Sequence, residues 1–143
     1  MADTLREQII TAFTARAQSL STNTVERVRR SEFEGTARNV SIWDGEDTAE
    51  GKEFGIQEYS FPIAIDMQWK PAENPSISAN AAIGETINTM IGTNSTFDDL
   101  AKRTDYLSST PTYPADGSGY VALTVIFNIY YATKIGDPFT AVN

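Results

Sequence analysis

The stretch "GYVALTVIFNIYYAT" (residues 119–133) predicts the strand on which the fold is built. Successive side chains of a strand point to opposite faces, so alternate residues share a face. One face carries Val121, Leu123, Val125, Phe127, Ile129 and Tyr131. The other face is also fairly apolar and carries Ala122, Thr124, Ile126, Asn128 and Tyr130. This pattern predicts a central strand that is covered on both sides.

Two further segments predict neighbours of this strand. The run "TDYLSSTPTY" (104–113) precedes it and is joined to it by "PADGSG" (114–119), which is typical of a hairpin. The run "FPIAIDMQWK" (61–70) alternates apolar and polar or small residues, which predicts a strand with one buried face. Pro62 cannot donate to a sheet ladder, so we expect it near the strand start or on an edge.

Two helices are predicted by apolar residues at helical spacing. The first covers about 4–20, and Thr4 and Glu7 have the spacing of a capping box at its start. The second covers about 77–91, and Gly92 stands where a left-handed glycine would end it. The segment 96–103 predicts a short helical turn with acids at its start and basic residues at its end.

The remaining segments predict two short strands and a loop. "VERVRR" (25–30) fits a short strand or a helical turn, and we favour the strand; "RNVSIW" (38–43) fits a second strand. "DGEDTAEGKEFG" (44–55) is polar and punctuated by glycine, which indicates an exposed loop. We therefore expect an α+β fold: a mostly antiparallel mixed sheet with two main helices on one face, in a single domain over 1–143 with 136–143 as a C-terminal arm.

The composition excludes several kinds of chemistry. The 143 residues contain no Cys, which removes disulfides, thiol nucleophiles and zinc–thiolate sites. They contain no His, which removes the most common general base and transition-metal ligand. We expect no cofactor and no metal, and the sequence offers no positive sign of an enzyme.

The charge argues against binding to nucleic acid phosphates. The formal net charge is −8, and residues 1–38 hold six Arg against five acids, whereas residues 39–143 hold five basic and fourteen acidic side chains. The start "MADTLREQII" lacks the pattern of a secretory signal, and no run approaches the roughly 18 apolar residues of a membrane span. The cytosol is therefore the expected default compartment.

The acidic segment offers hard oxygen ligands, the kind that calcium prefers. Its carboxylates belong to Asp44, Glu46, Asp47, Glu50 and Glu53. Their spacing does not match an EF-hand loop, which requires acids at alternating positions and a glycine at the sixth. We favour a solvated loop over a calcium site.

Two other groups of charged residues have both a functional and a simpler interpretation. Asp66 and Asp105 are candidates for the carboxylate pair of a glycoside hydrolase, but an exposed strand carboxylate is the simpler interpretation of Asp66. Arg27, Arg29 and Arg30 form a basic cluster with acids close by. That cluster fits an anion site, a rim of ion pairs between subunits, or a solvated strand face, and we favour the last. No glycine-rich phosphate loop is present in the sequence.

The segment after the last strand, "GDPFTAVN" (136–143), contains two apolar side chains, Phe139 and Val142. These either dock on a neighbouring subunit or fold back onto their own sheet. Pro138 restricts Asp137 to an extended conformation, which suits an arm held in one direction.

The order of these motifs resembles the tail-terminator (tail-completion) proteins of tailed bacteriophages, the family that includes the minor tail protein U of phage lambda. The resemblance rests on the helix "ADTLREQIITAFTARA" (2–17), the acidic "WDGED" (43–47), "FPIAIDMQWK" before a helix, and the closing "DYLSSTPTYPADGSGYVALTVIFNIYYATKIGDPF" (105–139). It covers nearly the full chain.

The resemblance implies a structural virion protein that forms a ring, typically a hexamer, which caps the tail tube and stops its polymerisation. Implied partners are other copies of the chain, the tail tube protein, a head-completion or connector protein, and the tail sheath where one exists, while DNA passes through without specific binding. The acidic segment (Asp44, Glu46, Asp47, Glu50 and Glu53) is then a candidate lumen or tube-facing element that repels DNA. Arg27, Arg29 and Arg30 on one side, and Asp137, Pro138 and Phe139 on the other, are candidates for the subunit interface.

Three alternatives stay open from the sequence. A head-completion or neck connector protein differs from a terminator in its partner rather than in its chemistry. A small cytosolic carboxylate-dependent hydrolase would be a monomer with a carboxylate-lined cleft. A ligand-binding module would be a monomer or dimer with an apolar pocket.

Overall fold

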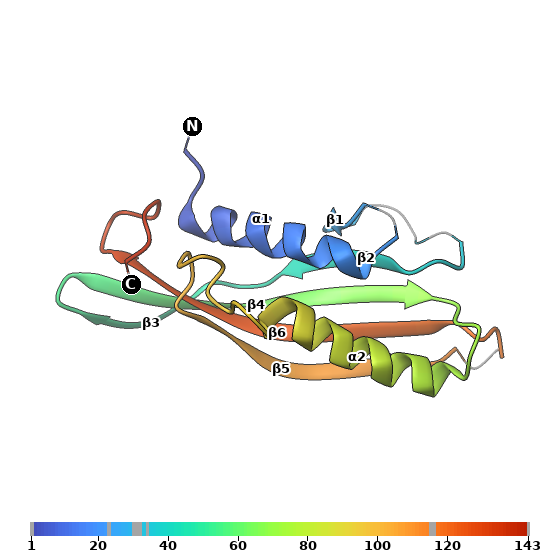
Figure 1. The fold of residues 1–143 in the computed structure, drawn as a ribbon. Helices are drawn as coiled ribbons and strands as arrows, with labels where there is room; N and C mark the ends of the chain where they lie inside the picture. The colour runs from blue at the N-terminus through green and yellow to red at the C-terminus, as the bar shows by residue number, and fades with distance from the viewer. Residues whose placement is uncertain (1, 23, 30–32, 34, 115–116, 143) are drawn as a thin grey trace.

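Two long strands, β4 (Ile56–Trp69) and β6 (Val121–Lys134), pair antiparallel over their full lengths at the centre of a sheet (Figure 1). The computed structural model describes residues 2–22, 24–29, 33, 35–114 and 117–142. Within these residues the sheet has six strands in the order β1-β2-β4-β6-β5, with β3 beside β4. β5 (Arg103–Thr112) borders β6 and β2 (Asn39–Asp44) borders β4, both antiparallel.

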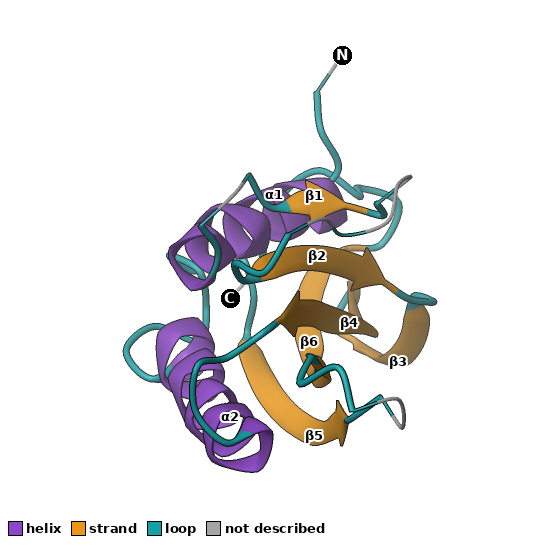
Figure 2. Cartoon of the chain, turned by 90° about the vertical axis from the view of Figure 1, so that its right-hand side faces the viewer, coloured by secondary structure: helices purple, strands orange, loops and turns teal. Residues whose placement is uncertain are grey.

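The sheet is mixed because β1 (Glu26–Arg27) runs parallel to β2. The two helices, α1 (Leu5–Ala17) and α2 (Pro75–Ile91), lie on the same side of the sheet (Figure 2). The predicted α+β class, with helices on one face of a mostly antiparallel sheet, is confirmed.

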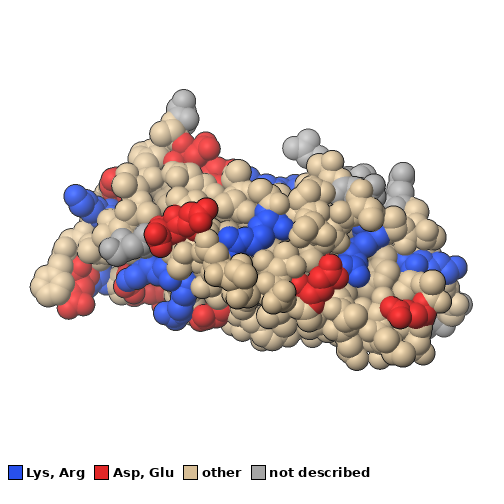
Figure 3. Space-filling view, viewed as in Figure 1, with Lys and Arg blue, Asp and Glu red and all other residues tan. Residues whose placement is uncertain are grey.

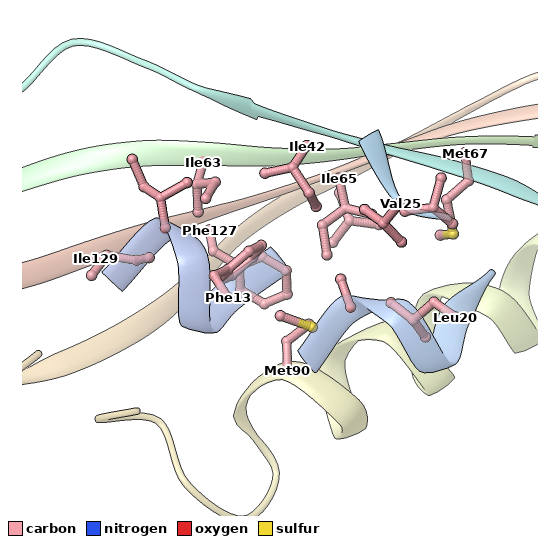
Figure 4. Close-up of a cluster of buried hydrophobic side chains, with 14 of the residues drawn as sticks. Phe13, Leu20, Val25, Ile42, Ile63, Ile65, Met67, Met90, Phe127 and Ile129 are labelled. Atoms are coloured by element: carbon pink, nitrogen blue, oxygen red, sulfur yellow. The ribbon is translucent and has the colours of Figure 1, made fainter. Parts of the chain in front are cut away.

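The core lies between the helices and one face of the sheet (Figure 4). α1 buries Leu5, Ile9, Ile10, Phe13 and Ala17. The chain continues in a 3-10 turn, η1 (Gln18–Leu20), that buries Leu20. The ring of Phe13 lies 5.9 Å from that of Phe127 on β6 and 5.7 Å from that of Phe97. The aromatic centre of the core therefore joins α1, β6 and the loop after α2.

The prediction that β6 is covered on both sides is wrong. Its odd-numbered residues from Val121 to Tyr131 are buried, whereas Ala122, Thr124, Ile126, Asn128 and Tyr130 are only half-buried. The physical reason is that both described helices pack on the odd face. The even face of the sheet remains open to solvent along its centre.

α2 begins two residues earlier than expected, at Pro75. The side chain of Asn74 caps it by accepting from the backbone N–H of Ser76 at 2.9 Å, and proline fits the first helical position because it needs no donor there. Gly92 ends the helix in a right-handed conformation, with φ of −67°, and not in the expected left-handed one. The glycine is needed for space, because a Cβ would lie 2.3 Å from the Asn88 carbonyl oxygen.

The helical turn predicted at 96–103 is also wrong. Phe97, Asp98 and Asp99 have φ of 52°, 59° and 67°, so the chain turns in the left-handed sense. Left-handed conformations cost L-residues roughly 1–2 kcal/mol each. The turn places Phe97 in the core beside Phe13, and this tertiary contact explains why local helix signals do not decide the conformation.

Pro62 lies in the middle of β4, not near its start or on an edge. It is tolerated because the ladder on one side of β4 is interrupted there: β2 ends at Asp44, opposite Ile63, and β3 (Thr48–Glu53) begins opposite Ser60. The three residues between these strands bulge away from regular pairing. Across this break, Gly45 donates its N–H to the carbonyl of Pro62 at 2.8 Å.

The exposed loop expected at 44–55 is largely a strand. β3 pairs with the first half of β4 and forms a hairpin whose turn is Phe54-Gly55. All six residues of β3 are exposed, and the hairpin extends past α1 toward the left end of the molecule (Figure 1). The sequence showed no alternation in "TAEGKE" because neither face of β3 is buried.

Candidate functional site

The acidic segment is divided between structural ion pairs and solvent-exposed carboxylates. Arg6 of α1 donates to Asp44 at 2.8 Å and to Asp47 at 3.3 Å, and also to the carbonyl of Gly45 at 2.6 Å. Its guanidinium lies 4.3 Å from the centre of the Phe61 ring. Two of the five predicted acids therefore anchor the first turn of α1 to the break between β2 and β3.

The other three acids lie on the exposed hairpin side of this anchor. Glu50 hydrogen bonds to the hydroxyl of Ser60, while Glu46 and Glu53 are exposed. Among the described residues, no group of three or more acidic side chains is arranged to hold a metal ion. The carboxylates of the segment that make no ion pair with Arg6 thus lie on the solvent-exposed surface at and beside the hairpin.

Tyr131 connects this segment to the centre of the sheet. Its hydroxyl donates to Asp47 at 2.7 Å, and its ring stacks on Tyr59 with centroids 5.0 Å apart. Burial, followed by the hydrogen bond to Asp47, raises the pKa of Tyr131 well above its ordinary value of 10. The phenol is therefore a neutral structural donor and not a proton-transfer group at neutral pH.

The predicted basic cluster is engaged within its own chain. Arg27 donates to both carboxylate oxygens of Glu7 on α1, one of them at 3.0 Å. Arg29 lies 3.8 Å from a carboxylate oxygen of Asp66 and 4.1 Å from the centre of the Phe33 ring. Arg30 lies outside the described residues. Arg27 therefore pairs with a carboxylate of α1, on the helix side of the sheet, and Arg29 pairs with one of β4 on the opposite face.

The predicted arm folds back against the start of α1. The carbonyl of Pro138 accepts from the backbone N–H of Leu5 at 2.7 Å, and that of Phe139 accepts from Gln8 at 3.1 Å. Asp137 caps the turn by accepting from the backbone N–H of Phe139 at 3.0 Å. Val142 donates its N–H to the carbonyl of Ala132, so the segment pairs with β6 just beyond the point where β5 begins. The backbone is held in the chain, but the Phe139 side chain is 44% exposed.

The two carboxylates considered for glycoside hydrolysis do not meet. Asp66 of β4 lies opposite Thr124 of β6, and Asp105 of β5 lies opposite Asn128. They are separated by the width of two strand spacings and by four residues along β6, roughly 16 Å in all. Glycoside hydrolases need roughly 5–10 Å between the two groups. The geometry does not supply this reaction.

Two hollows occur at the hairpin end of the described chain, on opposite faces of the sheet. A shallow one of about 350 Å³ is bordered by Phe54, Ile56, Glu58, Lys102 and Val142. A smaller one of about 190 Å³ is lined by Tyr59, Tyr131, Thr133 and Pro138, with Arg6 and Asp47 at its rim. Neither is enclosed or contains a catalytic constellation.

Sequence reasoning missed the most exposed large hydrophobic side chain in the described structure. Phe54 is 93% exposed at the turn of the hairpin, and Ile135 beside it is 57% exposed. Ile135 donates its N–H to the carbonyl of Gly55 at 2.9 Å, which ties the end of β6 to the turn. The signal in the sequence is the pair Phe54-Gly55 before an alternating run, since two-residue hairpin turns favour glycine at their second position.

Comparisons with known proteins add no family to this picture. No family model matches the chain, and a search of curated proteins finds no match. Of the described helices, neither is long and apolar enough to cross a membrane.

Proposed function

We propose that this chain is a structural virion protein, a tail-terminator-like subunit that forms a ring, with six copies as the expected number. The ring caps a phage tail tube, ends its polymerisation and offers a joining surface to the head. Its partners are then further copies, the tail tube protein, a head-completion or connector protein, and a tail sheath protein where the tail contracts. The proposal starts from the family resemblance of the sequence motifs.

The observation that carries the proposal is the exposed hairpin formed by β3 and the first half of β4. A strand exposed along its whole length, ending in a 93% exposed phenylalanine, buries little within its own chain. Such an element costs conformational entropy to order, and contacts in an assembly would offset this cost. The open even face of the sheet likewise offers surface to a neighbour.

The excess of acids in residues 44–53, five against one Lys, supports a passage for DNA without binding. Figure 3 shows acidic and basic side chains side by side over the hairpin end, and an uncharged extreme tip. Because Asp44 and Asp47 are paired with Arg6, the acids left to face a lumen are Glu46, Glu50 and Glu53. Glu46 lies in the break before β3, and Glu50 and Glu53 lie on β3. In a lumen these three carboxylates would repel DNA phosphates.

The test is native mass spectrometry of the purified protein across concentration, together with negative-stain images and binding to purified tail tubes. We expect six-fold rings with an open centre, or capping of the ends of the tubes. A twelve-fold ring would favour a neck connector. A chain that stays monomeric at high concentration and fails to bind tubes would refute the proposal.

The role of the three acids that make no ion pair with Arg6 is tested by changing Glu46, Glu50 and Glu53 together to Lys. Rings should still form, whereas DNA passage should slow and phage titre should fall. The control is the same triple change to Gln, which removes charge without attracting phosphates. An unchanged titre with Lys would refute the lumen assignment alone.

A further inference from the structure

Phe54 combines two unfavourable features at one residue. Its side chain is 93% exposed, and its backbone has φ of 52°, the left-handed region that aromatic L-residues rarely adopt. Gly55 follows with φ of 76°, as the two-residue turn between Glu53 and Ile56 requires. Asparagine or glycine would fit the first turn position without this strain. A strained residue that gains little burial in its own chain indicates a contact outside it.

The same end of the molecule has a hollow with the size of a single side chain. At about 190 Å³ it is smaller than the roughly 300–1,000 Å³ typical of small-molecule sites. One wall is the stacked pair Tyr59 and Tyr131. The rest of the lining comes from Thr4, Arg6, Asp47, Thr133 and Pro138. We call this the aromatic hollow. An aromatic ring fits such walls well, because aromatic pairs gain energy beyond their buried area.

The aromatic hollow and the hairpin turn face opposite sides of the sheet. Tyr59, Tyr131 and Thr133 belong to the face that packs on α1, whereas Ile56 and Glu58, which border the shallow hollow together with Phe54, belong to the opposite face. Tyr59 also lies three residues, roughly 10 Å, inside the strand end at Ile56. Phe54 lies beyond that end and therefore does not reach the aromatic hollow of its own chain.

We propose that Phe54 of one copy inserts into the aromatic hollow of a second copy. The inference rests on the proposed ring, because a projecting group on one face and a matching hollow on the other make the head-to-tail contact that a ring requires. Charged side chains lie near both surfaces: Lys52 and Glu53 precede Phe54, and the ion pair of Arg6 and Asp47 borders the hollow. Each copy then gives one side chain and receives one.

The experiment separates the two surfaces by using two forms of the chain. A ¹⁵N-labelled Phe54→Ala protein keeps the hollow and lacks the inserting ring. Unlabelled wild-type protein is added to about 1 mM, and we expect chemical-shift changes at the amides of Tyr59, Tyr131 and Thr133. Unlabelled Phe54→Ala should give at least tenfold weaker changes. Unlabelled Leu107→Ala, which removes a 54% exposed side chain on β5, should act as wild type.

Each outcome decides the inference. Absence of shifts at the hollow would overturn it, and so would shifts confined to the even face around Thr124 and Ile126. Rings that form equally well from Phe54→Ala protein would overturn it and leave the proposed function standing. Shifts at the hollow in a protein that makes no rings and caps no tubes would support the contact and refute the proposed function.

Discussion

Gly45 and Pro62 lie against each other at the break in the ladder between β2 and β3. The N–H of Gly45 donates to the Pro62 carbonyl at 2.8 Å, and a Cβ on Gly45 would lie 2.6 Å from the Cγ of Pro62. This close approach lets the chain leave β2 after Asp44 and resume pairing with β4 as β3 at Thr48. Pro62, which has no N–H to donate, lies opposite the gap. The position of the hairpin therefore depends on this contact.

Substitution of Gly45 by Ala should destabilise the protein by about 1–3 kcal/mol, the usual cost of an overpacked contact. The clash is with a rigid proline ring and its backbone carbonyl, so a side-chain rotation cannot relieve it. The matched control is Gly51→Ala in β3, where an added Cβ meets nothing within 4 Å. Urea unfolding of both variants checks the prediction, and equal stabilities would contradict it.

Arg16 holds the left-handed turn that places Phe97 in the core. Its guanidinium lies 4.0 Å from the centre of the Phe97 ring and donates to the carbonyls of Met90, at 2.8 Å, and Asn94. Partial burial lowers the pKa of Arg16 from its ordinary value, but the group remains charged at all working pH values.

Replacing Arg16 by Ala should lower the free energy of unfolding by about 2–3 kcal/mol, because it removes charged hydrogen bonds to two backbone carbonyls. Arg16→Lys keeps the charge but lacks the planar donor fork, and should recover only part of the loss. Thermal and urea unfolding measure both effects. Full recovery by Lys would show that charge alone matters at this position.

The sequence predicted those elements whose patterns are local. The helix from Leu5, the core face of β4 and the hairpin of β5 and β6 follow from spacing, because one side of each meets the core. The left-handed turn at Phe97 depends on Arg16, eighty-one positions earlier, and the place of Pro62 depends on the break between β2 and β3. Neither dependence is visible in the pattern of residues that are adjacent in the sequence.

The candidate site residues show the same division. Composition drew attention to the acidic segment, but it could not tell which acids Arg6 engages, because that depends on how α1 packs over β2. Phe54 escaped notice because β3 has no buried face and hence no alternation. Exposure is a property of the fold, so the sequence alone could not identify this side chain as unpartnered within the chain.

Asp66 should make the protein less stable as pH rises. Burial raises the pKa of its carboxyl above the ordinary value of 3.8, and this outweighs the opposing effects of Arg29 and Thr124. The stability present below pH 3.8 is therefore lost as pH rises through the folded-state pKa. Asp66→Asn should be more stable than wild type at pH 7, and the difference should shrink below pH 3.8. Urea midpoints across pH test this, with Asp105→Asn as the control for net charge.

Glu7 should have the opposite dependence. Its hydrogen bonds from Arg27 lower the pKa of the carboxyl below the ordinary value of 4.5, so its contribution is present above that pH and lost as pH falls through the folded-state pKa. The pair is about one-third exposed, so Glu7→Gln should cost only about 0.5 kcal/mol at pH 7. The difference between the two proteins should vanish in acid. A gap that persists at a pH well below the folded-state pKa of Glu7 would assign the effect to helix packing rather than to the ion pair.

Phe54→Asn should stabilise the isolated chain while it weakens self-association. Asparagine accepts the left-handed conformation that the first position of this turn requires, which relieves strain of about 1 kcal/mol. The change removes almost no burial, because the phenyl ring is 93% exposed. Urea unfolding of the monomer measures the gain, and sedimentation velocity over a range of concentrations measures the loss of association. A less stable monomer would show that Phe54 stabilises its own chain, and this result would count against the proposed contact with a second copy.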